Sequence, residues 1–174
     1  MENPPLQATK DRRIFIGIGI KTSVAFSLED VCQDLLKWPQ LQKARWTEKS
    51  NLHLTLKFIG PVSEEQLALI DRTLRLFIPT LSPVEIKLTE FGAFPQLERG
   101  RLIYAKADAN EGLVRLRAEI ERRLIEEGFP MEPLGFVPHV TLARLKEVKD
   151  FSKTKFPLLN LSQMANEVIL FESV

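Results

Sequence analysis

The chain has 174 residues, 44% of them apolar and 27% charged, and its formal net charge is +1. These values argue against a disordered chain and against a membrane protein, and they suit one globular domain over residues 1–174. A near-neutral charge also argues against the strongly basic surface that grips long nucleic-acid duplexes. A short or terminal nucleic-acid substrate is compatible with it.

Cysteine usage and the N-terminus point to a reducing compartment. Cys32 is the only cysteine, so neither an intrachain disulfide nor a cysteine-based zinc site can form. The first residues, MENPPLQATKDRR, lack the apolar stretch of a secretory signal, and no apolar run approaches the roughly 20 residues of a membrane span. We therefore expect a soluble, cytoplasmic protein.

The first half of the chain predicts strands and helices in alternation. Residues Arg13–Ile20 are mostly β-branched or aromatic in a run too short for a helix, which indicates a strand. Apolar residues recur at three- and four-residue steps over Ser23–Lys37, which predicts a helix. Apolar and polar residues alternate over Leu52–Phe58, as in a half-buried strand. Ser63 and Gln66 form a capping box that begins another helix.

The second half contains the same kinds of element. Val84–Phe91 and Arg101–Ala107 indicate two strands of a hairpin that is closed by a long, turn-rich loop. Asn110 is a favourable N-cap for the next helix, and Gly128 is a favourable stop. Another strand is predicted over His139–Leu145.

The two halves follow one plan, which indicates a duplicated unit. The segment RRIFIGIGI, a helix and HLTLKFIG are matched by RLIYAKADA, a helix and HVTLARLK, and Glu167–Phe171 adds a final short strand. Because strand, helix and strand recur in the same order, we expect two similar lobes whose histidine-bearing strands face one groove.

Both histidines of the chain lie in the pattern His-x-Thr-Leu, His53 with Thr55 and His139 with Thr141. Residues two apart in a strand share a face, so each imidazole and the hydroxyl beside it point into the same space. A single histidine would more often be a structural residue, and threonine favours strands in any case. The repetition of the whole pattern favours a functional pair.

Three chemistries compete for a histidine pair. A metal site would lack most of its ligands, because the sequence has no HExxH motif and no clustered carboxylates or cysteines. A nucleophilic triad would lack a G-x-S-x-G turn, and Cys32 lies within a predicted helix. General acid–base catalysis of phosphoryl chemistry needs no further group, because one imidazole can deprotonate the attacking water or hydroxyl while the other protonates the leaving oxygen. The threonine hydroxyls would then hold the phosphate oxygens.

These motifs resemble those of the two-histidine phosphoesterase superfamily, whose signature is a pair of H-x-[ST] motifs. The segments RRIFIGI, NLHLTLKFIG and FVPHVTLAR are similar to its RNA 2′,3′-cyclic phosphodiesterase branch, also called 2′-5′ RNA ligase. The likeness runs from about Arg12 to Phe171.

The resemblance implies an α+β fold of two duplicated βαβ-type lobes, with antiparallel sheets around a central groove. It implies hydrolysis of a 2′,3′-cyclic phosphate at an RNA end to a 2′-phosphate, with neither a metal nor a nucleotide cofactor. His53 and His139 would be the acid and base, and Thr55 and Thr141 would bind the phosphate. The likeness favours His53 as the acid that protonates the leaving 3′ oxygen and His139 as the base that activates water.

Further residues are candidates for substrate binding. Arg144 carries a planar, permanently charged guanidinium that suits a phosphate, although strict alternation places it opposite the second histidine unless the strand contains a bulge. Phe15 could stack on a base, as could Trp46, and the alternative for both is core packing. Lys57 counts onto the face of the first histidine, where it would attract anions or be solvated.

The expected partners are RNA ends with a 2′,3′-cyclic phosphate, tRNA fragments among them, or small cyclic phosphates, bound by a monomer with no membrane association. Several alternatives stay open. The same groups can run the reverse reaction as a 2′-5′ RNA ligase, because the site serves both directions. The substrate can instead be a small cyclic nucleotide. A nucleotide- or RNA-binding module would keep the groove without turnover, and a structural domain would bind no ligand.

Overall fold

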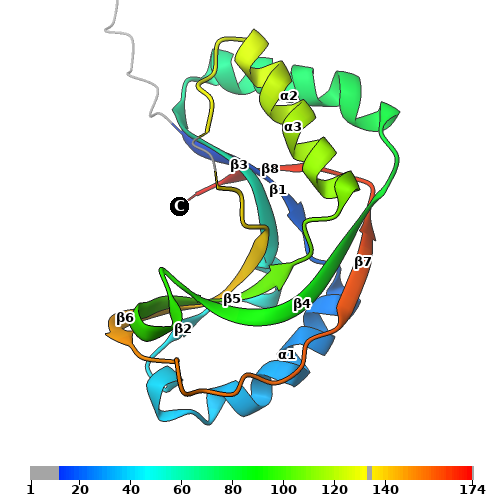
Figure 1. Ribbon diagram of the computed structural model, residues 1–174. Helices are drawn as coiled ribbons and strands as arrows, with labels where there is room; N and C mark the ends of the chain where they lie inside the picture. The colour runs from blue at the N-terminus through cyan, green and yellow to red at the C-terminus, as the bar shows by residue number, and fades with distance from the viewer. Residues whose placement is uncertain (1–11, 133–134, 174) are drawn as a thin grey trace, which may run out of the picture.

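The computed structural model describes residues 12–132 and 135–173, which fold into a C-shaped α+β body (Figure 1). The strands are β1 (Arg12–Gly19), β2 (Arg45–Trp46), β3 (His53–Val62), β4 (Val84–Phe94), β5 (Gly100–Ala107), β6 (His139–Lys149), β7 (Leu161–Ala165) and β8 (Ile169–Glu172). The helices are α1 (Thr22–Leu36), α2 (Glu64–Phe77) and α3 (Glu111–Glu126). No helix in this described part of the chain is both long enough and apolar enough to cross a membrane.

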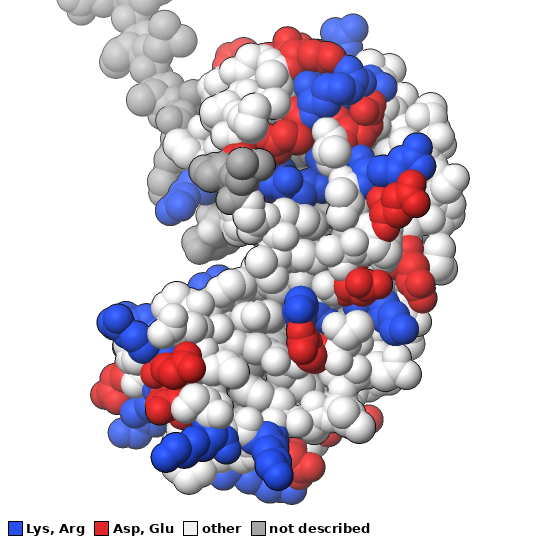
Figure 2. Space-filling model, in the orientation of Figure 1, with Lys and Arg blue, Asp and Glu red and all other residues white. Residues whose placement is uncertain are grey.

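The strands form one antiparallel sheet. Their order is β7-β4-β5-β6-β3-β1-β8, and β2 pairs with β6 outside this path. The two halves of the chain meet at the centre, where β3 pairs with β6 through Leu54 and Val140. The α+β fold is confirmed, and the sheets of the two lobes are joined into a single bent sheet. Its concave face borders the hollow between the lobes in Figure 2.

The helices lie on the convex side of the sheet. In Figure 1, α2 and α3 pack together over the upper lobe, and α1 lies along the lower lobe beside β7. The Ser63 hydroxyl accepts from Gln66 N–H, and the Gln66 side chain accepts from Ser63 N–H, so the predicted capping box starts α2. The Asn110 side chain caps Leu113 N–H at the start of α3, and the chain turns after that helix at Gly128 with φ +88°.

The predicted strands are all present, but β3, β4 and β6 run further than expected, and β2 and β7 were not predicted. β4 continues to Phe94, into the segment predicted as loop. In β7, the buried Gln163 accepts from Lys21 N–H at 2.7 Å and donates to the carbonyl of Gly19 at 2.9 Å. These two bonds hold the end of β1 and the start of α1 against the lower lobe.

Candidate active site

The two His-x-Thr motifs begin β3 and β6, the central strands of the sheet. Their middle residues, Leu54 and Val140, pair with each other and are 0% exposed. Neighbouring residues of a strand point to opposite faces. The histidines and threonines on either side of these buried residues therefore point to the concave face, and the core behind the sheet fixes their position.

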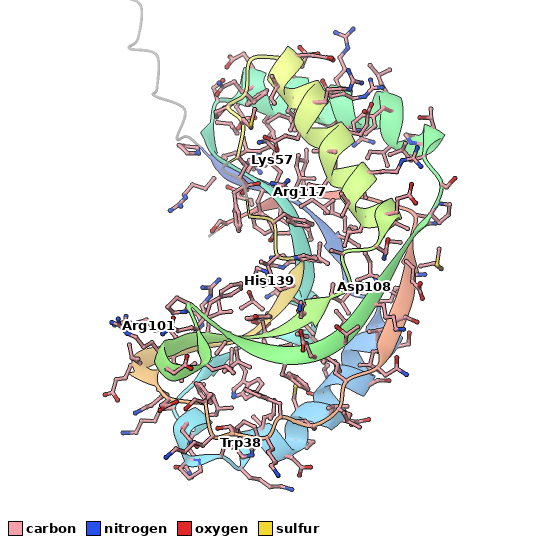
Figure 3. All side chains as sticks on the ribbon, in the orientation of Figure 1. Trp38, Lys57, Arg101, Asp108, Arg117 and His139 are labelled. Carbon is pink, nitrogen blue, oxygen red and sulfur yellow. The ribbon has the colours of Figure 1, made fainter. Side chains whose placement is uncertain are left out.

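The register of the central strands sets four polar side chains beside one another. When the antiparallel pairing is continued by one residue in each direction, His53 lies opposite Thr141 and Thr55 lies opposite His139. All four side chains are half-buried. His139 lies near the middle of the concave face in Figure 3. The structure thus brings two imidazoles and two hydroxyls into one patch.

Both imidazoles are oriented by the same kind of hydrogen bond. His53 Nδ1 lies 2.7 Å from the carbonyl oxygen of Asn51, and His139 Nδ1 lies 2.7 Å from that of Val137. A carbonyl oxygen only accepts hydrogen bonds, so Nδ1 carries the proton and donates it in each ring. Nε2 is therefore the nitrogen of each imidazole that gains or loses a proton.

Two aromatic rings pack against His53. Its ring centroid lies 4.8 Å from that of Phe15 on β1 and 4.9 Å from that of Phe171 on β8, and these two phenyl rings stack at 4.9 Å. Gly17 leaves room for Phe171, because a Cβ there would lie 3.2 Å from that ring and 2.7 Å from the carbonyl oxygen of Leu54. Phe15 is thus in contact with the histidine, at the border of the site.

His139 has a matching pair of neighbours, which the sequence patterns did not predict. Its ring lies 5.0 Å from that of Phe94 on β4 and 5.3 Å from that of Tyr104 on β5. A Cβ at Gly92 would collide with the Tyr104 ring. Tyr104 had a signal in the sequence, because aligning RRIFIGIGI with RLIYAKADA matches it to Phe15. Phe94 had no such signal in the sequence, since it lies in the segment predicted as a loop.

The surroundings of His53 lower the pKa of its imidazole below the usual 6.5. The largest cause is burial, which penalises the charged ring, and the positive charges of His139 and Arg144 act in the same direction. The hydrogen bond to the carbonyl of Asn51 opposes them. The charged form of His53 is therefore a stronger acid than a histidine in water, and His139 and Arg144 both lie near enough to influence it.

A β-bulge turns Arg144 towards the site. Opposite β5, strand β6 contains one extra residue at Leu142. Leu142 and the following Ala143 are both buried, so the alternation reverses and Arg144 lies on the same face as His139. The bulge required for a substrate-binding role is therefore present. Arg45 on β2 pairs with Arg144, which places a second guanidinium on this part of the face.

A bulge at the equivalent place in β3 removes Lys57 from the site. The extra residue is Leu56, after which Lys57 points into the core and is 2% exposed. Its ammonium donates to both carboxylate oxygens of Glu121 and to the carbonyl of Pro130, each at 2.9 Å. The prediction that Lys57 attracts anions or is solvated is therefore wrong. This lysine joins β3 to α3 and to the loop after it (Figure 3).

Trp46 also turns away from the concave face. It pairs with the buried Ala143 and lines a cavity of about 120 Å³ behind the sheet, together with Leu28 and Cys32 of α1. Trp46 therefore packs against the core and offers no surface to a base in the groove. Burial raises the pKa of the Cys32 thiol to about 12, so this cysteine stays protonated.

Metal ligands do not gather in the described residues. Within residues 12–132 and 135–173, no three His, Cys, Asp or Glu side chains come together as they would around an ion. The functional groups that do converge are the two imidazoles, the two threonine hydroxyls and the guanidinium of Arg144. These groups can donate or accept protons and can bind an anion.

Comparisons with known proteins agree with one another. The sequence profile of the 2′-5′ RNA ligase superfamily matches residues 30–169. A Methanocaldococcus jannaschii protein named RNA 2′,3′-cyclic phosphodiesterase is 34% identical over 82% of this chain and 77% of its own length. A Bacillus subtilis protein of the same name is 27% identical over 91% of this chain and 86% of its own length. The crystal structure of a Thermus thermophilus protein, TT0787, has a TM-score of 0.76 at 25% identity, over 91% of this chain and 86% of that one.

Proposed function

Because the chain belongs to the 2′-5′ RNA ligase superfamily, we propose that it hydrolyses 2′,3′-cyclic phosphates at RNA ends to 2′-phosphates without a metal. The relatives named RNA 2′,3′-cyclic phosphodiesterase support this reaction. The observation that carries the mechanism is the matched pair of imidazoles, each with Nδ1 committed to a carbonyl oxygen. Such a pair supplies one acid and one base.

In the proposed reaction, the oxygen of a water molecule forms a bond to phosphorus while His139 Nε2 takes a proton from that water. The bond between phosphorus and the 3′ oxygen breaks, and His53 Nε2 gives its proton to the departing oxygen. The products are a 2′-phosphate and a 3′-hydroxyl, and proton exchange with solvent removes the proton from His139 Nε2 and restores the one on His53 Nε2. General acid or base catalysis contributes about 10² to 10⁴ in rate for each group.

The assignment of His53 as the acid follows from the likeness of its motif to the family. Burial and nearby positive charge lower its pKa, so its charged imidazole is less populated near neutral pH and is a stronger proton donor. Thr55 and Thr141 would donate hydroxyl hydrogen bonds to the non-bridging phosphate oxygens, and Arg144 would balance the negative charge that develops there. Phe15 borders the site, where it would contact the substrate and orient the imidazole of His53.

The test is hydrolysis of a short RNA with a 2′,3′-cyclic phosphate end, with EDTA present and the product isomer identified. Wild type is expected to produce the 2′-phosphate. His53→Ala and His139→Ala are each expected to lower kcat by about 10² to 10⁴, while their urea unfolding curves stay close to that of wild type. Loss of wild-type activity in EDTA would contradict the metal-free mechanism.

The same assay separates the alternatives. With a 5′-hydroxyl RNA added, a 2′-5′-linked product in excess of the hydrolysis product would identify ligation as the main reaction. Faster turnover of small cyclic nucleotides than of RNA would identify those as substrates. RNA binding without turnover, unchanged in both histidine variants, would identify a binding module.

A further inference from the structure

Three cations lie together in the groove beyond His139. Arg45 on β2 pairs with Arg144 on β6, and Lys146 follows two residues later on β6. Trp46, the neighbour of Arg45, packs behind the sheet, and Leu145 packs against the core. Because neighbouring residues of a strand point to opposite faces, all three cations project from the concave face. We call these three residues the cationic track.

The charges of the cationic track are available to a ligand. All three side chains are exposed, and within residues 12–132 and 135–173 none of them takes part in an ion pair. By contrast, Lys106, which pairs with His139 across β5 and β6, gives its ammonium to Glu90. Clustered cations that are not balanced by acids attract anionic ligands.

The cationic track leads away from the histidine pair. Strand β6 starts with His139 near the middle of the concave face and runs to the outer end of the lower lobe, where β2 lies beside it (Figure 1). Arg144 and Lys146 are two residues apart in a strand, which is roughly 6.5 Å. Neighbouring phosphates of an extended RNA strand have a similar spacing, so successive phosphates can meet successive cations.

The equivalent part of the upper lobe differs in charge. Counted from the histidines, Phe58 and Gly60 of β3 stand at the places of the two β6 residues of the track, and neither is charged. The carboxylate of Glu132, which is paired with Arg117, lies 3.5 Å from the Phe58 nitrogen. A chain of phosphates is therefore attracted more strongly to the lower lobe.

We propose that the body of the RNA leaves the site along the cationic track, where Arg45 and Lys146 bind the phosphodiesters on the 5′ side of the cyclic end. This inference rests on the proposed function, because the cyclic phosphate must lie between the two histidines. The preferred substrate is then an oligonucleotide, and a mononucleotide is a poorer one. The track does not select a base sequence, since phosphate contacts carry no sequence information.

The experiment compares adenosine 2′,3′-cyclic phosphate, which has no other phosphate, with a tetranucleotide that ends in the same group. Arg45→Gln/Lys146→Gln is expected to lower kcat/KM for the tetranucleotide about tenfold and to leave the mononucleotide within about twofold of wild type. Each phosphate contact of a single strand contributes about −0.7 to the slope of log affinity against log salt. The double variant should therefore flatten the salt dependence of kcat/KM for the tetranucleotide by about 1.4.

Two controls match these changes. Arg72→Gln removes an exposed cation from α2, outside the groove, and should change none of these values. A tetranucleotide with uncharged methylphosphonate linkages removes the charges from the substrate instead. Wild type should hydrolyse it about tenfold less efficiently than the natural tetranucleotide, and the double variant should lose nothing further on it.

Other outcomes overturn the inference separately from the proposed function. Equal losses on both substrates would show that Arg45 and Lys146 act on the cyclic phosphate or on folding. An unchanged tetranucleotide would show that the RNA does not follow the track. A loss confined to the tetranucleotide in Arg13→Gln, on the concave face of β1, would show that the RNA leaves over the upper lobe. If wild type hydrolyses neither substrate, the proposed function itself fails.

Discussion

Strands β3 and β6 begin with the same arrangement of side chains and differ further along. Each begins with a histidine that donates Nδ1–H to a carbonyl two residues earlier and packs against two aromatic rings. Each has a bulge directly after its threonine. Beyond the bulge, β3 presents Lys57 to the core and Phe58 to the groove, whereas β6 presents Ala143 and Arg144.

This comparison separates two tasks. The side chains that would transfer protons and hold the phosphate are nearly the same in the two strands. This is expected if both imidazoles act at the same phosphorus. The parts beyond the bulge are unequal, since the substrate itself has different groups on its two sides. Substitutions in the matched histidine motifs should therefore lower activity most. Substitutions of the residues beyond the bulges should affect one lobe or one group of the substrate.

The largest effect is expected at the histidines. Because His53 and His139 are proposed to act in one step, their losses should not add. The double variant His53→Ala/His139→Ala is expected to have kcat within about tenfold of the worse single variant, each single loss being about 10² to 10⁴. Single-turnover hydrolysis of cyclic-phosphate RNA measures this. Fully multiplied losses would mean that the two rings act independently.

The next largest effect is on stability and concerns the buried lysine that has no counterpart in β6. Lys57→Met leaves the carboxylate of Glu121 without its cation, and breaking a buried ion pair on one side costs about 3 to 5 kcal/mol. Urea unfolding should show this loss, and Lys57→Met/Glu121→Gln should recover much of it. Arg115→Ala, which breaks an exposed pair with Glu111, is the matched control and should be neutral. Neutral Lys57→Met would refute the anchoring role.

A smaller effect is expected from Arg144, the groove residue that β3 replaces with Phe58. Charge-assisted hydrogen bonds contribute about 1.5 to 3 kcal/mol, so Arg144→Ala should lower kcat/KM about 10- to 100-fold. The loss should be similar for adenosine 2′,3′-cyclic phosphate and for methyl riboside 2,3-cyclic phosphate, which carries no base. Arg72→Ala, an exposed cation on α2, should have no effect. A loss confined to the adenosine compound would contradict a phosphate contact.

The smallest effect is a displacement of the pH profile. The plot of kcat/KM against pH should be bell-shaped, with one limb for each member of the pair. The rising limb of such a profile reports the lower pKa of the pair, so the lowered pKa of His53 puts that limb below the usual 6.5. The positive charge of Arg144 contributes to that lowering, so Arg144→Gln should move the limb to higher pH. A limb that stays in place or moves to lower pH would contradict this coupling.

Local patterns in the sequence predicted the elements that depend on local chemistry. The capping side chains of Ser63 and Asn110 and the turn at Gly128 are where those residue types imply. The internal duplication placed both histidine strands at the centre of the fold, because the matching order of elements carries over to matching positions. The short strands β2 and β7 lacked such a signal, and β7 is held by Gln163 through contacts distant in sequence.

Alternation along a strand failed where the backbone is irregular. Counting by twos placed Lys57 beside His53 and Arg144 away from His139, and the two bulges reverse both assignments. A bulge depends on the register with the neighbouring strand, which a single sequence does not contain. Phe94 was missed for a related reason: its strand continues through residues typical of a turn, held by pairing with β5.

The central claim is that two equivalent imidazoles perform different jobs, and a sulfur-substituted substrate tests it most directly. When sulfur replaces the 3′ bridging oxygen, the leaving thiolate needs no proton because its pKa is only about 8.5. His53→Ala should then lose less than about tenfold, whereas His139→Ala should keep its full loss of about 10² to 10⁴. Equal losses in both variants, or rescue of His139→Ala alone, would contradict the assignment of His53 as acid and His139 as base.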